Sequence, residues 1–179
     1  MLILPLGSGQ NITISTLNFN IMDIILRNTI RNINAGYCFF VSSIYMGIMW
    51  SLHYFWYEGW SSLKLDNVAE HFVGPTSRAT EFFTILVPIM FAVTIIMLIM
   101  EWKKRTFWPT LIIFLGIVVS TYVGYLLIIP INKEIAAGLA TQEDLNAHLE
   151  KWMYLNNVRK DTTTVMWLGC LFYYIVKKD

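Results

Sequence analysis

The chain has 179 residues, of which 56% are hydrophobic, 15% aromatic and 14% charged, and its mean hydropathy is +0.53. A soluble domain of this length carries more charge, so these values exclude an ordinary soluble protein and indicate an integral membrane protein. The net charge of +1 provides no general attraction for nucleic acid, and we expect no nucleic-acid partner. Because a chain in lipid must satisfy its backbone hydrogen bonds internally, we predict an all-α protein that contacts the bilayer.

The first 35 residues predict an N-terminal arm with an amphipathic helix. From about residue 17 to residue 34, isoleucines and a methionine recur at helical spacing beside a polar stripe that includes Asp23, Arg27 and Arg31. A helix of this kind lies along a membrane interface or packs against a partner subunit. We predict that it is an interfacial helix, separate from the membrane-spanning domain at residues 36–179.

Four apolar segments predict four membrane-spanning helices, at about residues 36–57, 78–100, 106–131 and 159–176. About 20 apolar residues are needed to cross the hydrocarbon core of a bilayer, and these segments approach or exceed that length. Pro88 interrupts the second segment. Gly116, Ser120 and Gly124 lie in the third, where small side chains let a neighbouring helix approach closely. The prediction is therefore an integral membrane four-helix bundle.

The distribution of basic residues predicts the orientation. Arg27 and Arg31 precede the first segment, Lys103–Arg105 separate the second from the third, and Lys177–Lys178 follow the fourth. Basic residues concentrate on the cytoplasmic side of membrane proteins. We therefore predict a multi-pass protein with both termini in the cytoplasm, which agrees with an even number of spans.

The longest polar passage, residues 130–159, lies between the third and fourth apolar segments. Thr141 begins a T-Q-E-D sequence that resembles a helix capping box. After it, apolar residues recur at helical spacing, at Leu145, Leu149, Trp152 and Leu155. We predict that this passage is partly helical and folds over the outer mouth of the bundle.

The predicted topology brings polar side chains together at the outer ends of the helices. Ionisable residues at membrane depth are costly and usually face the bundle interior, so they are candidate site residues. We predict catalytic roles for His53, Glu81 and Arg159, and substrate-binding roles for Tyr54, Arg78, Asn132, Trp152 and Asn156. The alternative is that these residues cap helices, extend to lipid headgroups or form ion pairs that hold helices together. Arg78 with Glu81, and Arg159 with Glu81 or Glu58, are the ion pairs expected in that case.

Potential metal ligands are few and poorly spaced. His53, Glu58, His71, Glu81 and His148 are available, but no H-x-x-x-H or E-x-x-H spacing places two of them on one helix face. We therefore predict no metal site and no cofactor, and haem or copper is the less favoured alternative.

Two short motifs in the polar passage resemble the anthrone oxygenase-like family of small four-helix membrane proteins. They are P-I-N-K-E after the third apolar segment and K-W-M-Y-L-N-N-V-R before the fourth, and their matching residues are Pro130, Asn132, Trp152, Asn156 and Arg159. The resemblance covers about residues 36–176. It implies oxidation of a lipophilic aromatic substrate by molecular oxygen without a recognised cofactor. On that reading His53 or Glu81 is the base, and Arg159 is one of the donors to an oxyanion.

Two other functions are compatible with the sequence. The chain resembles in its composition a non-catalytic accessory subunit of a larger membrane protein complex, and a third possibility is the binding or transport of a lipophilic small molecule. The interior of the bundle separates these hypotheses. An enzyme or a binding protein needs a cavity at the outer end, whereas an accessory subunit is expected to have a filled bundle and an apolar face for its partner.

Overall fold

The computed structural model describes residues 3–4 and 12–177, and the side chains of residues 22–177. Apart from two paired two-residue strands, β1 and β2, the described elements are helical. Three of them, named η, are short π-helical segments. In chain order the elements are β1 (Ile3–Leu4), β2 (Ile12–Thr13), α1 (Ile14–Ser51), η1 (Leu52–Trp56), α2 (Tyr57–Ser61), η2 (Ala69–Val73), α3 (Gly74–Met100), α4 (Phe107–Tyr122), η3 (Val123–Ile128), α5 (Ile129–Ala137) and α6 (Gln142–Val176).

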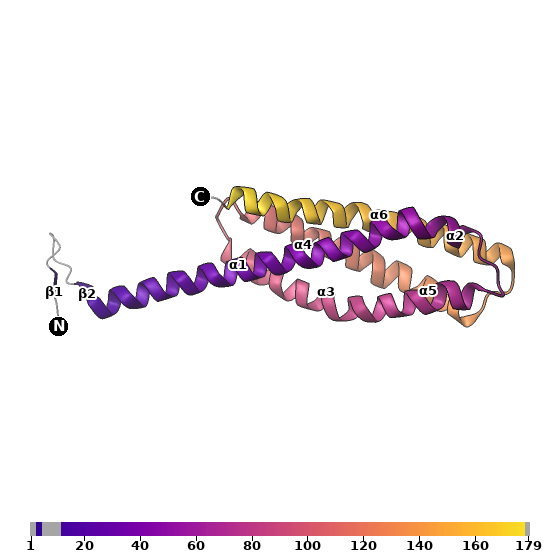
Figure 1. Cartoon of the computed structure of the whole chain (residues 1–179), viewed down its shortest axis with the longest axis horizontal. Coiled ribbons are helices and arrows are strands. Elements are labelled where there is room, and N and C mark those ends of the chain that lie inside the picture. The colour runs from indigo at the N-terminus through magenta and orange to yellow at the C-terminus, as the bar shows by residue number, and fades with distance from the viewer. Residues whose placement is uncertain (1–2, 5–11, 178–179) are drawn as a thin grey trace.

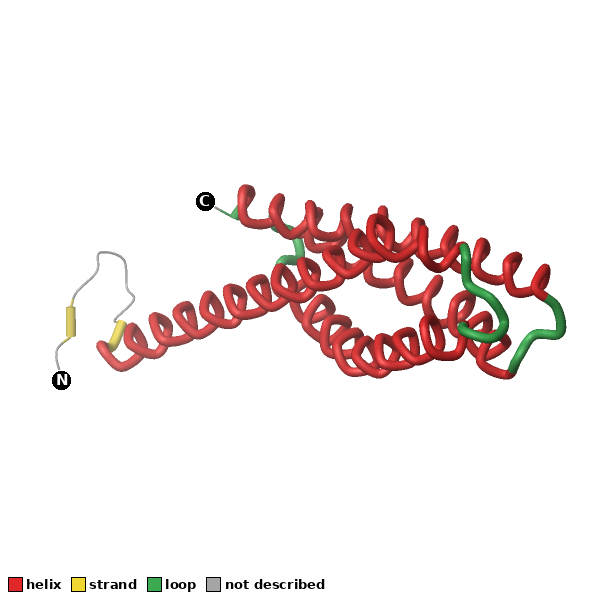
Figure 2. The backbone as a smooth tube through the Cα atoms, turned by 45° about the vertical axis from the view of Figure 1, so that its right-hand side comes forward, coloured by secondary structure: helices red, strands yellow, loops and turns green. Residues whose placement is uncertain are grey.

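The long helices form an antiparallel bundle (Figure 1). Helix α6 packs against α1 and α4, and α3 also packs against α1 and α4, so α3 and α6 occupy opposite corners. The α3–α4 turn and the C-terminal end of α6 lie at one end of the bundle, while the α2–α3 and α5–α6 connections lie at the other (Figure 2). We call these the turn end and the loop end.

Three helical stretches are long and apolar enough to cross a membrane, namely Met22–Ser61, Ala69–Met100 and Phe107–Ala137. Helix α6 is not one of them. Only the 15 residues of Thr162–Val176 separate Asp161 from its end, and 15 residues of helix span about 22 Å, which is short of a hydrocarbon core of about 30 Å. The predicted all-helical fold is confirmed, together with three helices that could span a bilayer.

The N-terminal arm differs from the prediction of a separate interfacial helix. Helix α1 runs without a break from residue 14 to residue 51, through the predicted boundary at residues 34–36. Gly36 alone does not end the helix, because a single glycine costs only about 1 kcal/mol there and the flanking residues continue to favour helix. The arm therefore projects from the turn end of the bundle as an extension of α1 (Figure 1), with Met22, Ile25 and Ile33 exposed.

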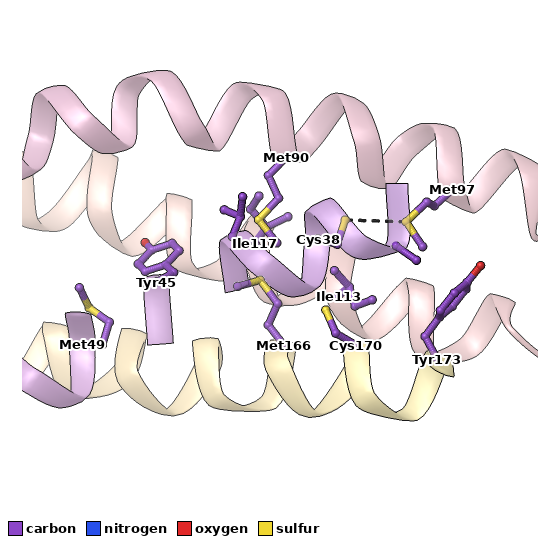
Figure 3. Packing of buried hydrophobic residues seen from close by; sticks show 12 residues of the cluster. Cys38, Tyr45, Met49, Met90, Met97, Ile113, Ile117, Met166, Cys170 and Tyr173 are labelled. Carbon is purple, nitrogen blue, oxygen red and sulfur yellow. Dashed lines mark hydrogen bonds between the residues drawn. The ribbon is translucent and has the colours of Figure 1, made fainter. Parts of the chain in front are cut away.

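The core near the turn end is rich in sulfur-containing side chains. Met90, Met97 and Met166 are buried there with Cys38 and Cys170 (Figure 3). Both cysteines are free thiols. Flexible, polarisable methionine side chains fill irregular gaps between helices, which accounts for their use in this layer.

Gly116 confirms the predicted close approach of helices at small residues. A Cβ atom at this position would lie 2.7 Å from the Cβ atom of Met166 on α6. No side chain fits at that distance, so the glycine lets α4 and α6 pack against each other along their length.

A buried carboxylate joins three elements at the turn end. The Glu101 side chain is 1% exposed and accepts hydrogen bonds from Arg31 Nε at 2.6 Å, Thr106 Oγ1 at 2.6 Å and Tyr173 Oη at 2.9 Å. Burial acts to raise the pKa of Glu101, but the hydrogen bonds from Thr106, Arg31 and Tyr173 outweigh it and hold the pKa below its ordinary value. This carboxylate therefore ties α1 and α6 to the α3–α4 turn.

The polar passage is partly helical, as predicted, and consists of α5 and the first half of α6. Gly138, with a φ of 91°, ends α5. Thr141 caps α6, because its Oγ1 accepts a hydrogen bond from the backbone N–H of Asp144 at 3.1 Å. The predicted apolar face is buried, with Leu145 0% and Leu149 1% exposed. The helix start at Thr141 and the helical periodicity are thus confirmed.

Candidate functional site

A cavity of about 740 Å³ lies inside the loop-end half of the bundle. Helices α1, α3 and α6 and the continuous α4–η3–α5 stretch all contribute to its wall. The wall is mainly apolar, and includes Ile48, Leu52, Phe83, Val87 and Ile128. Small-molecule sites in proteins have volumes of about 300–1,000 Å³ and mostly apolar walls with a few polar groups, so this cavity has the size and character of a ligand site.

Irregular helix geometry surrounds the cavity. The π-helical segments η1 and η3 both contribute wall residues, and α3 contributes Pro88 from its interior. A π-helical turn re-aims the side chains that follow it, and proline removes a backbone hydrogen bond. Helix α3 curves away from its neighbours along this stretch (Figure 2). These departures from regular α-helix therefore occur where the helices surround the cavity.

Arg159 is the charged residue of the cavity wall in the described part of the chain. Its Nε and Nη2 donate hydrogen bonds to Tyr45 Oη at 3.2 and 2.6 Å, and its Nη1 donates to Asn156 Oδ1 at 2.9 Å. The guanidinium also lies 5.3 Å from the centre of the Tyr45 ring and 5.8 Å from that of Phe83. Its hydrogen-bond partners are neutral, and none is a carboxylate. The predicted ion pairs of Arg159 with Glu81 or Glu58 are not formed among the described residues.

The polar residues of the two sequence motifs form one connected chain on the cavity wall. Trp152 Nε1 donates to Asn132 Oδ1 at 2.8 Å, and Asn156 Nδ2 donates to the backbone carbonyl of Trp152 at 3.0 Å. Asn156 in turn accepts the hydrogen bond from Arg159. All four side chains line the cavity. Their spacing of three or four residues on α6 places Trp152, Asn156 and Arg159 on one helix face.

Two residues of the cavity wall have hydroxyl groups without a hydrogen-bond partner. Ser120 Oγ and Thr121 Oγ1 are buried and unpaired. By contrast, the Thr94 and Thr110 hydroxyls, also within helices, donate to a backbone carbonyl four residues earlier. An unpaired buried hydroxyl is costly, so a rotation of either side chain that brings its hydroxyl to a partner in the cavity would be favourable. Sequence reasoning identified this pair only as small residues within an apolar segment.

The other predicted site residues do not line the cavity. His53 Nδ1 lies 2.9 Å from Asn157 Oδ1, and Tyr54 is 67% exposed. Arg78 and Glu81 are exposed, and no ion pair between them is found in the described range. Both occur on the outer face of α3, whereas Phe83 of the same helix faces inward. The predicted cluster therefore separates into a cavity group around Arg159 and a peripheral group.

The cavity wall contains no Asp, Glu or His side chain in the described part of the chain. No carboxylate or imidazole is therefore available among the described wall residues as a general base for proton abstraction. Within the same described range, no group of three His, Cys, Asp or Glu side chains is arranged to hold a metal ion. The arrangement is suited to binding a polar head beside an apolar body, with hydrogen-bond donors at one position.

A second polar contact closes the loop end. His148 Nε2 lies 2.7 Å from Glu134 Oε2, and His148 Nδ1 lies 2.7 Å from the backbone carbonyl of Asp144. The backbone hydrogen bond to Asp144 and the contact with Glu134 raise the pKa of His148 above its ordinary value. The contact joins α5 to α6 above the cavity.

Comparison with known proteins adds no assignment to this geometry. The chain matches no family model, no curated protein and no solved structure. The interpretation of the cavity therefore depends on the residues that form it.

Proposed function

We propose that this chain is a four-span integral membrane protein, with both termini in the cytoplasm, that binds a lipophilic small molecule in the cavity. One observation carries the proposal. The cavity of about 740 Å³ has a mainly apolar wall and a cation, Arg159, whose hydrogen-bond partners are neutral. A bundle that served only as a packing surface would gain stability by filling this space.

The position of the cavity along the bundle supports a site within the outer leaflet. Tyr173 contacts Glu101 at the turn end, which the basic cluster Lys103–Arg105 assigns to the cytoplasmic boundary. Arg159 precedes Tyr173 by 14 residues of α6, or about 21 Å of a hydrocarbon core of about 30 Å. In this placement α6 is the fourth span from about residue 153 onward, and its residues 142–152 and α5 lie outside the membrane.

Exposed wall residues support entry of the ligand from the lipid. Gly47 of α1 and Tyr125 of η3 both line the cavity and are exposed. They lie on the two elements that flank α3, and we infer that the cavity opens to the lipid beside that helix. At this depth the openings would face acyl chains rather than water, and a lipophile could enter without crossing an aqueous phase.

A site-blocking substitution tests the proposal. A Cβ atom at Gly124 would be 3.6 Å from the Arg159 guanidinium, an ordinary van der Waals distance, so Gly124→Phe adds a ring to the cavity beside Arg159. Gly59→Phe is the matched control, because Gly59 has open space and is not part of the cavity wall. The probe is 1-aminoanthracene, a flat neutral lipophile, with its emission excited through Trp56, Trp60 and Trp152 of the wall.

We expect saturable probe binding by the wild type and by Gly59→Phe, and at least about tenfold weaker binding by Gly124→Phe. Unchanged binding by folded Gly124→Phe, or no saturable binding by the wild type, would contradict the proposal.

Oxidation of the ligand is a second candidate function. It is favoured by one observation, that Asn132, Trp152, Asn156 and Arg159, which carry the resemblance to anthrone oxygenase-like proteins, line a single cavity. In that reaction the methylene carbon of an anthrone becomes a carbonyl, one atom of dioxygen enters the product and the other leaves as water. Oxygen consumption by the reconstituted protein with an anthrone, lost in folded Arg159→Lys, would support this function. Binding without oxygen consumption would limit the function to binding.

A further inference from the structure

We infer that the ligand of the cavity is a single-chain amphiphile with a small oxyanion head, such as a carboxylate, and that this head binds between Arg159 and the hydroxyls of Ser120 and Thr121. This inference rests on the proposed function, because it specifies the ligand of the same cavity. Three observations support it: the charge of Arg159 has no anionic partner, two wall residues have unpaired hydroxyls, and the remainder of the wall is mainly apolar.

The charge of Arg159 favours an anionic head. Its three hydrogen bonds to Tyr45 and Asn156 use only part of the donor capacity of a guanidinium, and leave the charge without an anion among the described residues. Buried or partly buried charges are normally paired, because an unpaired charge is costly away from water. A guanidinium presents a planar fork of donors that matches a carboxylate, so an oxyanion is the complement of this wall. A cationic head would be repelled.

The two unpaired hydroxyls belong to the same stretch of the wall as Gly124. Gly124 adjoins the guanidinium, since a Cβ atom placed on it would lie 3.6 Å from Arg159 Cζ. Ser120 precedes Gly124 by four residues, about 6 Å along a helix axis, and Thr121 is its neighbour. Both residues belong to the cavity wall, and their hydroxyl oxygens are buried and have no partner. An oxyanion bound to the guanidinium can therefore recruit either hydroxyl by a rotation of its side chain towards the cavity.

The remainder of the wall indicates the character of the rest of the ligand. On the bilayer-centre side of Arg159, the wall continues along α3 to Val87 and Pro88 and along α1 to Ile44. Apart from hydroxyls such as that of Ser43, this part of the wall is apolar, and the larger part on the loop-end side, which includes Leu52 and Trp60, is mainly apolar as well. Neither part holds a carboxylate that would repel an anion. A volume of about 740 Å³ is suited to one molecule of drug size rather than to a lipid with two acyl chains. The ligand therefore has one apolar chain, which follows this wall away from the head.

Photolabelling can test the head and the chain separately. The protein is reconstituted in nanodiscs of phosphatidylcholine and irradiated with one of three diazirine probes, namely a palmitic acid, the corresponding hexadecanol, or a phosphatidylglycerol with the diazirine in one acyl chain. Labelled residues are mapped by mass spectrometry. We expect the acid to label wall residues of α3 such as Phe83 and Val87 at least about tenfold more than the alcohol does, because hydrogen bonds to charged groups are stronger than neutral ones.

Variants of α6 identify the cation responsible. Arg159→Gln should remove the preference for the acid, and Arg159→Lys, which keeps the charge, should retain part of it. Lys160→Gln is the control, because Lys160 is the adjacent cation, lies over the Trp50 ring at 4.7 Å and is not part of the cavity wall. It should leave the preference unchanged.

The wild-type comparison remains decisive if the Arg159 variants do not fold. Equal labelling of the wall by acid and alcohol would overturn the oxyanion head and leave the proposed function in place. Preferential labelling by the phosphatidylglycerol would overturn the single-chain ligand. No labelling of the wall by any probe would overturn the inference and, together with absent 1-aminoanthracene binding, the proposed function as well.

Discussion

Glu101, which is buried, and Arg159, which is half-buried, have different partners in this bundle. Glu101 is surrounded by donors from Arg31, Thr106 and Tyr173, so its charge is paired and fully hydrogen-bonded. Arg159 has only neutral acceptors and faces a cavity. A paired charge connects helices, whereas a charge without an anion is available to a ligand. We therefore assign Glu101 to assembly of the bundle and Arg159 to its site.

Glu101→Gln is expected to destabilise the bundle. The substitution leaves Arg31 without its anion, and removing one partner of a buried ion pair costs about 3 kcal/mol or more. The apparent melting temperature in detergent should fall by about 10 °C, measured against Glu150→Gln, an exposed residue of α6. A decrease no larger than that of the control would mean that Glu101 does not stabilise the fold.

The raised pKa of His148 predicts that the stability of the protein depends on pH. Its pKa is raised in the folded state by the backbone hydrogen bond to Asp144 and by Glu134, so folding favours the protonated form. The contribution of His148 to the free energy of unfolding is therefore complete below the ordinary histidine pKa of about 6.5, and it is lost as the pH rises through the raised pKa of the folded state. Because the Glu134 side chain is 59% exposed, we expect at most about 1 kcal/mol.

The melting temperatures of wild type and His148→Gln measure this contribution. The wild type should be the more stable protein at a pH of about 5.5, and the difference should vanish by a pH of about 9, well above the ordinary histidine pKa. A difference that grows with rising pH would contradict the assignment.

At the scale of elements, the first half of α6 covers the loop end by burying one apolar face. Leu149 is 1% exposed within a cluster that includes Trp60, Phe72 and Trp152. Leu149→Asp places a carboxylate in that cluster, at a cost of several kcal/mol. We expect loss of monodisperse protein in size-exclusion chromatography, whereas Ala147→Asp, on the exposed face of the same helix, should behave as the wild type. Normal behaviour of both variants would mean that this face is not packed.

The elements could be predicted from the sequence where their signals are local. The cap at Thr141 and the apolar face of Leu145 and Leu149 depend on neighbours within a few residues, and both were found. The π-helical segments η1 and η3 have no comparable local signal. The predicted break between the N-terminal helix and the first span was wrong because residues 34–36 contain no helix-ending combination that outweighs continuation of α1. The interfacial position of the N-terminal part stays a prediction.

The site could be predicted only in part, for a reason specific to membranes. In α6 the polar residues Trp152, Asn156 and Arg159 share one face, so the sequence groups them. Helix α3 is apolar on all sides, because lipid tails are as apolar as a protein core, and periodicity cannot separate its inner face from its outer face. Arg78 and Glu81 were consequently assigned to the site, although the structure leaves them exposed.

For the whole molecule, the four-span arrangement predicts the positions of two reporters. A reporter fused after Asp179 should be cytoplasmic, and one inserted near Gln142, at the α5–α6 connection, should lie on the opposite side. Paired alkaline phosphatase and fluorescent protein fusions measure this directly. Reporters on the same side would exclude α6 as a membrane span and would remove Arg159 from the outer leaflet.

The most direct test of the ligand cavity is an experimental density map of the protein in nanodiscs, prepared with palmitate present. We predict continuous elongated density in the cavity, with its head within hydrogen-bond distance of Arg159 and its chain running along the apolar wall of α3. A cavity closed by inward movement of α3, with the Arg159 guanidinium paired to a carboxylate of the chain itself, would contradict this account.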